Sequence, residues 1–93
     1  MNHIQTALRI IRGARAKSYG CAADDFSGVA QIWNGILGPR LREPIRATDV
    51  PLMMVGLKLR RQGHRHKDDN LVDIHGYIAL LSEILNQQPK RKK

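Results

Sequence analysis

Apolar residues recur every three or four positions in four segments of this 93-residue chain. That spacing gathers them on one side of an α-helix, so the pattern predicts helices. The four predicted helices cover residues 2–15, 22–37, 49–61 and 70–86. No segment alternates apolar and polar residues for long enough to predict a strand. We therefore expect an all-α fold, a compact bundle of about four helices around a central helical hairpin.

The third predicted helix is the most informative about packing. Its segment VPLMMVGLKL is apolar nearly all round, which predicts a central, buried helix rather than a surface helix. Lys58 lies within this segment, and a buried ammonium group is costly unless it is paired. On the fourth helix, Asp73 projects toward packed surface and is the predicted partner. We expect helices three and four to form the central hairpin, with helix two across it and helix one more loosely attached.

The fourth predicted helix has two apolar strips. Leu71, Ile74 and Ile78 form one strip, and Tyr77, Leu80 and Ile84 form the other. One small hairpin cannot cover both strips, so the sequence predicts a homodimer.

The charge of the chain favours polyanionic partners. There are 16 Lys and Arg residues against eight Asp and Glu residues, a net charge of +8. This balance favours contact with nucleic acid, with phosphates or with an acidic or nucleoprotein partner. The candidate binding residues are the basic side chains of the first helix and of the segment around the third interhelix turn. They are Arg9, Arg12, Arg15, Lys17, Arg60, Arg61, Arg65 and Lys67.

Length and composition limit the remaining possibilities. We expect one helical domain over residues 1–88 and a basic disordered tail over residues 89–93. No apolar run approaches the roughly 18–20 residues of a membrane span, so no membrane partner is expected. The single cysteine, Cys21, permits no intrachain disulfide and fits a reducing interior. We therefore expect an intracellular, cytoplasmic protein.

The stretch HRHKDDNLVDIHGY, residues 64–77, has two interpretations. In the first, its aspartates form half of a Mg²⁺ or phosphate-bound metal site. In the second, they serve structure: Asn70 caps the fourth helix with Asp73 at its third position, and Asp73 pairs with Lys58. Within the same stretch, Gly76 interrupts helix-forming residues at a cost of ~1 kcal/mol. It therefore predicts close approach by another helix or a ligand.

Four fragments in fixed order, YG, W, MM..LK..R and DN..DI.GY, resemble a family of small helical proteins encoded mostly by phages and prophages. The resemblance covers residues 19–84. The matching positions are Tyr19, Gly20, Trp33, Met53, Met54, Lys58, Arg61, Asp69, Asn70, Asp73, Gly76 and Tyr77. It implies a phage or prophage protein acting inside a bacterial host. The family commonly has Asp directly after Tyr-Gly, where this chain has Cys21.

More distantly, the layout is similar to the MazG-type all-α nucleoside triphosphate pyrophosphohydrolases. That resemblance implies a Mg²⁺ site held by Asp25, Asp69 and Asp73, with a phosphate bound by Lys58 or Arg61. Four aspartates can supply oxygen ligands to Mg²⁺. However, the only two glutamates, Glu43 and Glu83, lie in neither acidic cluster.

Two functions remain open. The favoured one is a non-catalytic accessory protein that needs no cofactor and binds nucleic acid or a nucleoprotein complex. A counter-defence inhibitor of a CRISPR effector or nuclease falls within this class. The alternative is a MazG-like, Mg²⁺-dependent pyrophosphohydrolase or a nucleotide-binding relic of one.

Overall fold

The computed structural model describes residues 1–87, and every regular element in that range is helical. The elements are α1 (His3–Arg12), α2 (Ala14–Tyr19), α3 (Ala22–Leu37), the 3-10 helix η1 (Gly38–Arg40), α4 (Asp49–His64) and α5 (Asp68–Gln87). The all-α prediction is confirmed. The tail expected at residues 89–93 lies outside the described residues.

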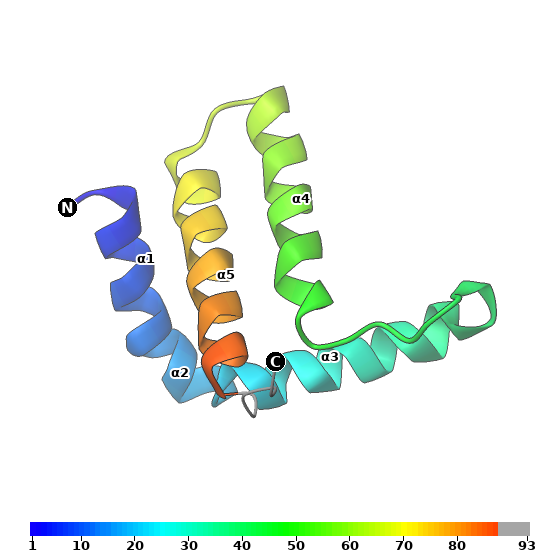
Figure 1. The fold of residues 1–93 in the computed structure, drawn as a ribbon. Helices are drawn as coiled ribbons and strands as arrows, with labels where there is room; N and C mark the ends of the chain where they lie inside the picture. The colour runs from blue at the N-terminus through cyan, green and yellow to red at the C-terminus, as the bar shows by residue number, and fades with distance from the viewer. Residues whose placement is uncertain (88–93) are drawn as a thin grey trace, which may run out of the picture.

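Helices α4 and α5 form a hairpin, as predicted. In Figure 1, α5 lies between α1 and α4, and α3 crosses beneath the hairpin at the C-terminal end of α5. The expectation of a loosely attached first helix is wrong. Ala7 and Ile11 on α1 are buried, because α1 packs along α5 at the position of Gly76.

The first predicted helix is divided in two by Gly13. A capping box fixes the start of α1: Asn2 Oδ1 accepts the Gln5 N–H at 2.7 Å, and Gln5 Oε1 accepts the Asn2 N–H at 3.1 Å. The helical path breaks at Gly13, and α2 follows. Gly20 then adopts a φ of 75°, a conformation that favours glycine, and the chain turns into α3.

The prediction that the third helix, α4, is a central, buried helix is wrong. Only Val50 and Pro51 are fully buried, whereas Leu52 and Leu59 are 55% and 57% exposed. The physical reason is that α5 contacts one side of α4 and α3 meets it near one end, so its remaining sides have no neighbouring helix among residues 1–87. The central helix is α5.

The hydrophobic core lies where α3 crosses the other helices. Phe26 on α3, Val50 on α4, and Leu80 and Ile84 on α5 are all buried there. Asn34 ties the following loop to α3, because its side chain donates to the Ile45 carbonyl at 3.0 Å and accepts the Ile45 N–H at 2.7 Å. These contacts hold the end of the hairpin that lies against α3. The turn between α4 and α5, at the other end, is exposed to solvent.

Candidate functional site

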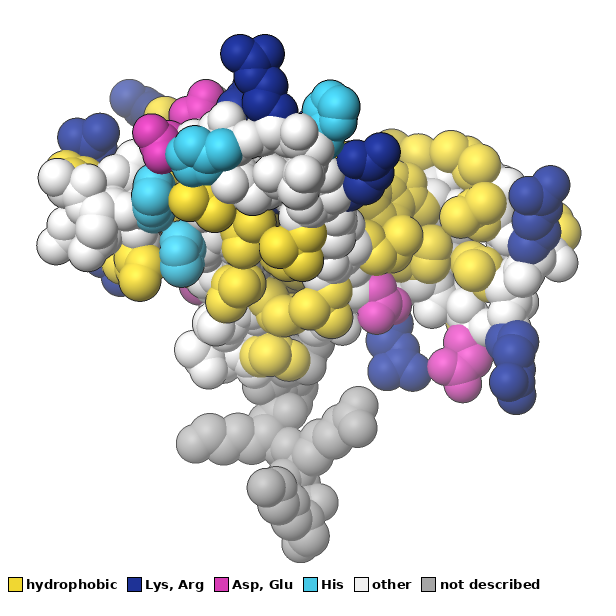
Figure 2. All heavy atoms as spheres, turned by 90° about the horizontal axis from the view of Figure 1, so that it is seen from above, with side chains coloured by type: hydrophobic (Ala, Val, Ile, Leu, Met, Phe, Trp, Pro, Cys, Tyr) yellow, Lys and Arg dark blue, Asp and Glu magenta, His cyan; other side chains and the backbone are white. Residues whose placement is uncertain are grey.

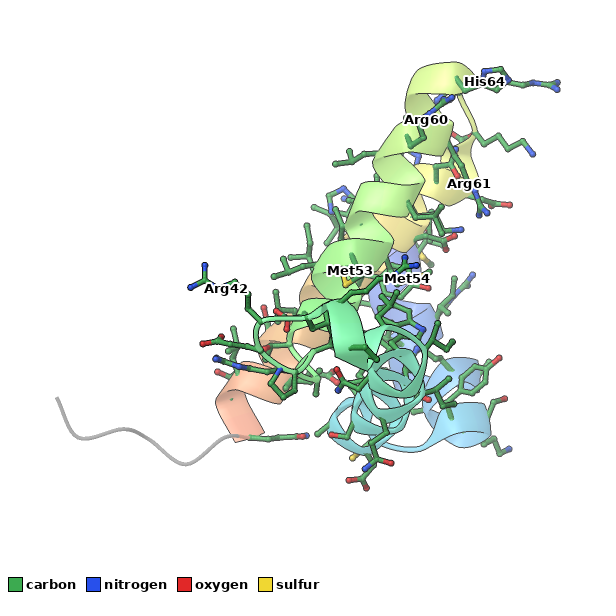
Figure 3. All side chains as sticks on the ribbon, turned by 90° about the vertical axis from the view of Figure 1, so that its right-hand side faces the viewer. Arg42, Met53, Met54, Arg60, Arg61 and His64 are labelled. Atoms are coloured by element: carbon green, nitrogen blue, oxygen red, sulfur yellow. The ribbon has the colours of Figure 1, made fainter. Side chains whose placement is uncertain are left out.

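A basic hollow lies where α4 ends and α5 begins. It encloses about 820 Å³. We call it the turn hollow, and its lining residues are Leu57, Lys58, Arg60, Arg61, His64, Arg65, Lys67, Asp69, Asn70 and Asp73. Figure 3 shows Arg60, Arg61 and His64 gathered at the turn end of α4. Five cationic and two anionic side chains thus surround one open space.

An ion pair between the two hairpin helices lines the turn hollow. Lys58 Nζ lies 2.8 Å from Asp73 Oδ2, and the two side chains are 16% and 40% exposed. The predicted Lys58–Asp73 pair is confirmed. Because these two charges neutralise each other, Asp69 is the one remaining acidic side chain of the lining, opposite four remaining cations.

The predicted capping role of Asn70 is wrong. The helix α5 begins at Asp68, so Asn70 lies inside its first turn and is only 6% exposed. Its side-chain amide donates to Gln62 Oε1 at 3.4 Å, and the Lys67 N–H donates to the same oxygen at 3.1 Å. Gln62 also contacts His66, with 2.7 Å between Nε2 and Nδ1. Gln62 therefore holds the turn that shapes the hollow.

Arg15 lies in an internal ion pair, apart from the other candidate basic residues. Its guanidinium donates to Asp25 Oδ2 at 2.7 Å, and the two side chains are 14% and 24% exposed. The guanidinium carbon also lies 5.0 Å from the Phe26 ring centroid and 5.5 Å from that of Tyr19. This cation–π packing ties α2 to α3. Sequence reasoning treated Arg15 and Asp25 separately because they belong to different predicted helices.

The remaining candidate basic residues form two separate groups. Arg60, Arg61, Arg65 and Lys67 lie together at the turn hollow. Arg9, Arg12 and Lys17 are exposed on α1 and α2. In the described part of the chain α1 makes no contact with α4, and α5 separates them. The sequence thus predicted the residues but not their division between two surfaces.

The candidate Mg²⁺ ligands do not come together. Asp69 is in the first turn of α5, whereas Asp25 is on α3, where it pairs with Arg15. Across residues 1–87, no group of three or more His, Cys, Asp or Glu side chains is placed to hold a metal ion. Asp25 and Asp73 are instead the partners of Arg15 and Lys58.

One cluster near the turn was missed by sequence reasoning. His3 Nε2 and His66 Nε2 each lie 3.3 Å from Asp68 Oδ1. These contacts join the start of α1 to the α4–α5 turn. No local sequence signal could find the contact of His3 with Asp68, because the two residues are 65 positions apart in the chain.

We expect Asp73→Ala to lower the free energy of unfolding by about 2 kcal/mol, between the values of exposed and buried ion pairs. The substitution leaves the mostly covered Lys58 ammonium without its partner. Urea unfolding followed by circular dichroism measures the change. Glu43→Ala is the matched control because its pair with Arg46 is exposed and 3.5 Å long. An equal, small effect of both substitutions would show that the Lys58–Asp73 pair contributes nothing to stability.

The family model described as a domain of unknown function (DUF6378) matches residues 2–85. The chain belongs to the DUF6378 family. It is 30% identical over 92 residues to the Gene 55 protein of Mycobacterium phage L5, covering 98% of this chain and 57% of that protein. It is 28% identical over 85 residues to the Gene 55 protein of Mycobacterium phage D29, covering 90% of this chain and 54% of that protein. The chain thus spans little more than half the length of these phage relatives.

These matches confirm the resemblance to phage proteins of unknown function. The more distant resemblance to MazG-type enzymes stays a prediction. No solved structure matches this DUF6378 chain.

None of the helices within residues 1–87 combines the length and apolar character needed to cross a bilayer.

Proposed function

We propose that this DUF6378 protein is a non-catalytic phage accessory protein that binds the phosphate backbone of nucleic acid at the turn hollow. The observation that supports this proposal is the convergence of Arg60, Arg61, Arg65 and Lys67 around one open space. The Lys58–Asp73 pair leaves these four cations opposed by Asp69 alone within the lining. Several cations around a phosphate chain gain affinity by releasing its condensed counterions.

The form of the hollow suits a backbone rather than a single small ligand. About 820 Å³ is open at the edge of the molecule, and the cationic side chains are long and exposed. Arg and Lys at such positions contact phosphates without reading base sequence. We therefore expect binding with little sequence preference. Inhibition of a host nuclease or CRISPR effector inside the bacterial cell stays a prediction within this class.

The pyrophosphohydrolase alternative has less support. It requires several carboxylates to share Mg²⁺, and the described structure pairs Asp25 with Arg15 and Asp73 with Lys58. The homodimer also remains a proposal, and it has support from α5. The strip with Leu80 and Ile84 is buried in the core, whereas Ile78 in the other strip is 48% exposed.

We expect binding of a fluorescent single-stranded oligonucleotide to weaken steeply with added salt. Replacing both Arg61 and Arg65 with glutamine should lower the log–log salt slope by roughly 1.5, since each phosphate contact releases about 0.7–0.9 of a counterion. Fluorescence anisotropy at several salt concentrations measures both slopes.

The matched control replaces Arg40 and Arg42 with glutamine, which removes the same charge from the exposed segment after α3. This variant should keep the original slope. An equal fall in both variants would show that net charge alone drives binding. If replacing Arg9 and Arg12 lowers the slope instead, the contact lies on α1. Equal affinity for an acidic polypeptide would indicate an acidic protein partner.

A further inference from the structure

The α4–α5 hairpin has an exposed apolar face on the side away from the turn hollow. We call it the hairpin face, and its residues are Leu52, Val55 and Leu59 on α4 with Ile74, Ile78, Leu81 and Leu85 on α5. Spacings of three and four place each set on one side of its helix. Leu52, Leu59, Ile78 and Leu85 are between 48% and 57% exposed. Figure 2 shows apolar side chains gathered over this part of the molecule.

The two sides of the hairpin differ sharply in charge. Lys58 and Arg61 line the turn hollow with Asp69 and Asp73. At 100° per residue, these residues lie about a quarter to a half turn away from the hairpin face. Beside the apolar residues of the hairpin face lie two glycines, a serine and a histidine, and none of them is a Lys, Arg, Asp or Glu. They are Gly56, Gly63, Ser82 and His75. Among the described residues of α4 and α5, no Lys, Arg, Asp or Glu belongs to this face.

We propose that the hairpin face is the contact between two copies of this chain, so this inference rests on the proposed self-association. Each copy carries a net charge of +8. Repulsion between two such chains is smallest where neither presents a cation, and the hairpin face is such a surface. A strongly acidic partner would find no cation on it. Residues 88–93, with sequence QPKRKK, have four positive charges and no large apolar side chain to cover it.

Contact through this face joins two hairpins into a four-helix assembly. Antiparallel helix pairs stack in this way with their axes crossing at about 20°. Because the turn hollow lies on the opposite side of the hairpin, both hollows stay open in the dimer. A long nucleic-acid strand can then contact two hollows at once, which raises apparent affinity through effective concentration. A short oligonucleotide that reaches one hollow gains nothing from the dimer.

Sedimentation velocity from micromolar to submillimolar protein tests the contact. The unchanged chain should dimerise with rising concentration. Leu59→Glu and Ile78→Glu should each weaken dimerisation at least about a hundredfold, because two-fold symmetry buries the new charge twice. Both residues are half exposed in one copy, so the fold should tolerate the change, and circular dichroism checks this. Ile36→Glu is the matched control, since Ile36 is a 71% exposed apolar residue on α3. It should leave the dimer unchanged.

A monomer at every concentration would overturn the proposal. So would a dimer that survives Leu59→Glu and Ile78→Glu but is lost in Ile36→Glu, since the contact would then involve α3. Methyl NMR shifts on dilution give a second measurement: Ile74 and Ile78 should move, and Ile32 and Ile36 should not. Anisotropy with a short oligonucleotide separates the two proposals. The variants Leu59→Glu and Ile78→Glu, which lose the dimer, should keep the log–log salt slope of oligonucleotide binding per chain. The variant with glutamine at Arg61 and Arg65 should still dimerise in sedimentation velocity.

Discussion

Phe26→Ala should lower the free energy of unfolding by about 3–5 kcal/mol, the usual cost of truncating a buried aromatic residue. Phe26 is 4% exposed and lies where α3 crosses the hairpin. Its ring lies 6.3 Å from that of Tyr77 on α5, and the Arg15 guanidinium lies over it at 5.0 Å. The substitution therefore opens a cavity and loosens contacts of α3 with both α2 and α5. Such a loss is a large part of the roughly 5–15 kcal/mol that stabilises a typical domain.

Urea unfolding followed by circular dichroism measures the loss. Ile36→Ala on the same helix is the control, because Ile36 is exposed and its truncation should change stability by less than about 0.5 kcal/mol. Phe26→Leu should cost less than Phe26→Ala, since it keeps more of the buried volume. Equal midpoints for Phe26→Ala and Ile36→Ala would contradict the placement of Phe26 in the core.

Gly76→Leu should destabilise the protein by about 2–3 kcal/mol, at the upper part of the range for overpacking. A Cβ at position 76 would lie 3.7 Å from Ile11 Cγ2 and 3.9 Å from Ala7 Cβ, which is ordinary contact. The three carbon atoms beyond Cβ must either enter the space of about 100 Å³ beside Gly76 or move α1 away from α5. Loss of this packing should also weaken the contact of His3 with Asp68 at the far end of α1.

Gly76→Ala is the informative comparison. The single methyl group fits the contact distances, and alanine favours a helix over glycine by roughly 0.5–1 kcal/mol. Gly76→Ala should therefore be neutral or slightly stabilising in the same unfolding experiment. Hydrogen exchange of α1 amides should accelerate in Gly76→Leu and stay unchanged in Gly76→Ala. Strong destabilisation by both variants would mean that α1 lies closer to α5 than the structure shows.

The local pattern of the sequence predicted the helices well, because helix formation follows from apolar spacing and from nearby stop signals. The segment 22–37 was predicted with the bounds that α3 has, since Gly38 and Pro39 mark its end. The Lys58–Asp73 pair was also predictable, because the position of Lys58 within an apolar helix required a partner. Gly76 predicted a close approach, although the sequence did not say that α1 makes it.

Burial of α4 could not be read from its composition. An apolar helix is buried only if other elements surround it, and a chain of this length supplies too few helices to cover α4 on all sides. The prediction assumed that apolar residues are inside, but many apolar side chains of folded proteins remain exposed. The exposed Leu52 and Leu59 follow from this shortage of neighbours, and they now belong to the hairpin face.

The sequence by itself determined the helical fold class, the excess of positive charge and the phage-family resemblance. Those properties depend on residue type and local order alone. Only the tertiary structure decided which charges act together. In the folded chain Arg15 pairs with Asp25, and Asp25 and Asp69 form no common metal site within residues 1–87. Arg61 and Arg65 line one hollow, whereas Arg9 and Arg12 lie on α1, which does not contact α4. Helix crossings set these distances, and they depend on contacts between residues far apart in the chain, for which the local pattern has no signal.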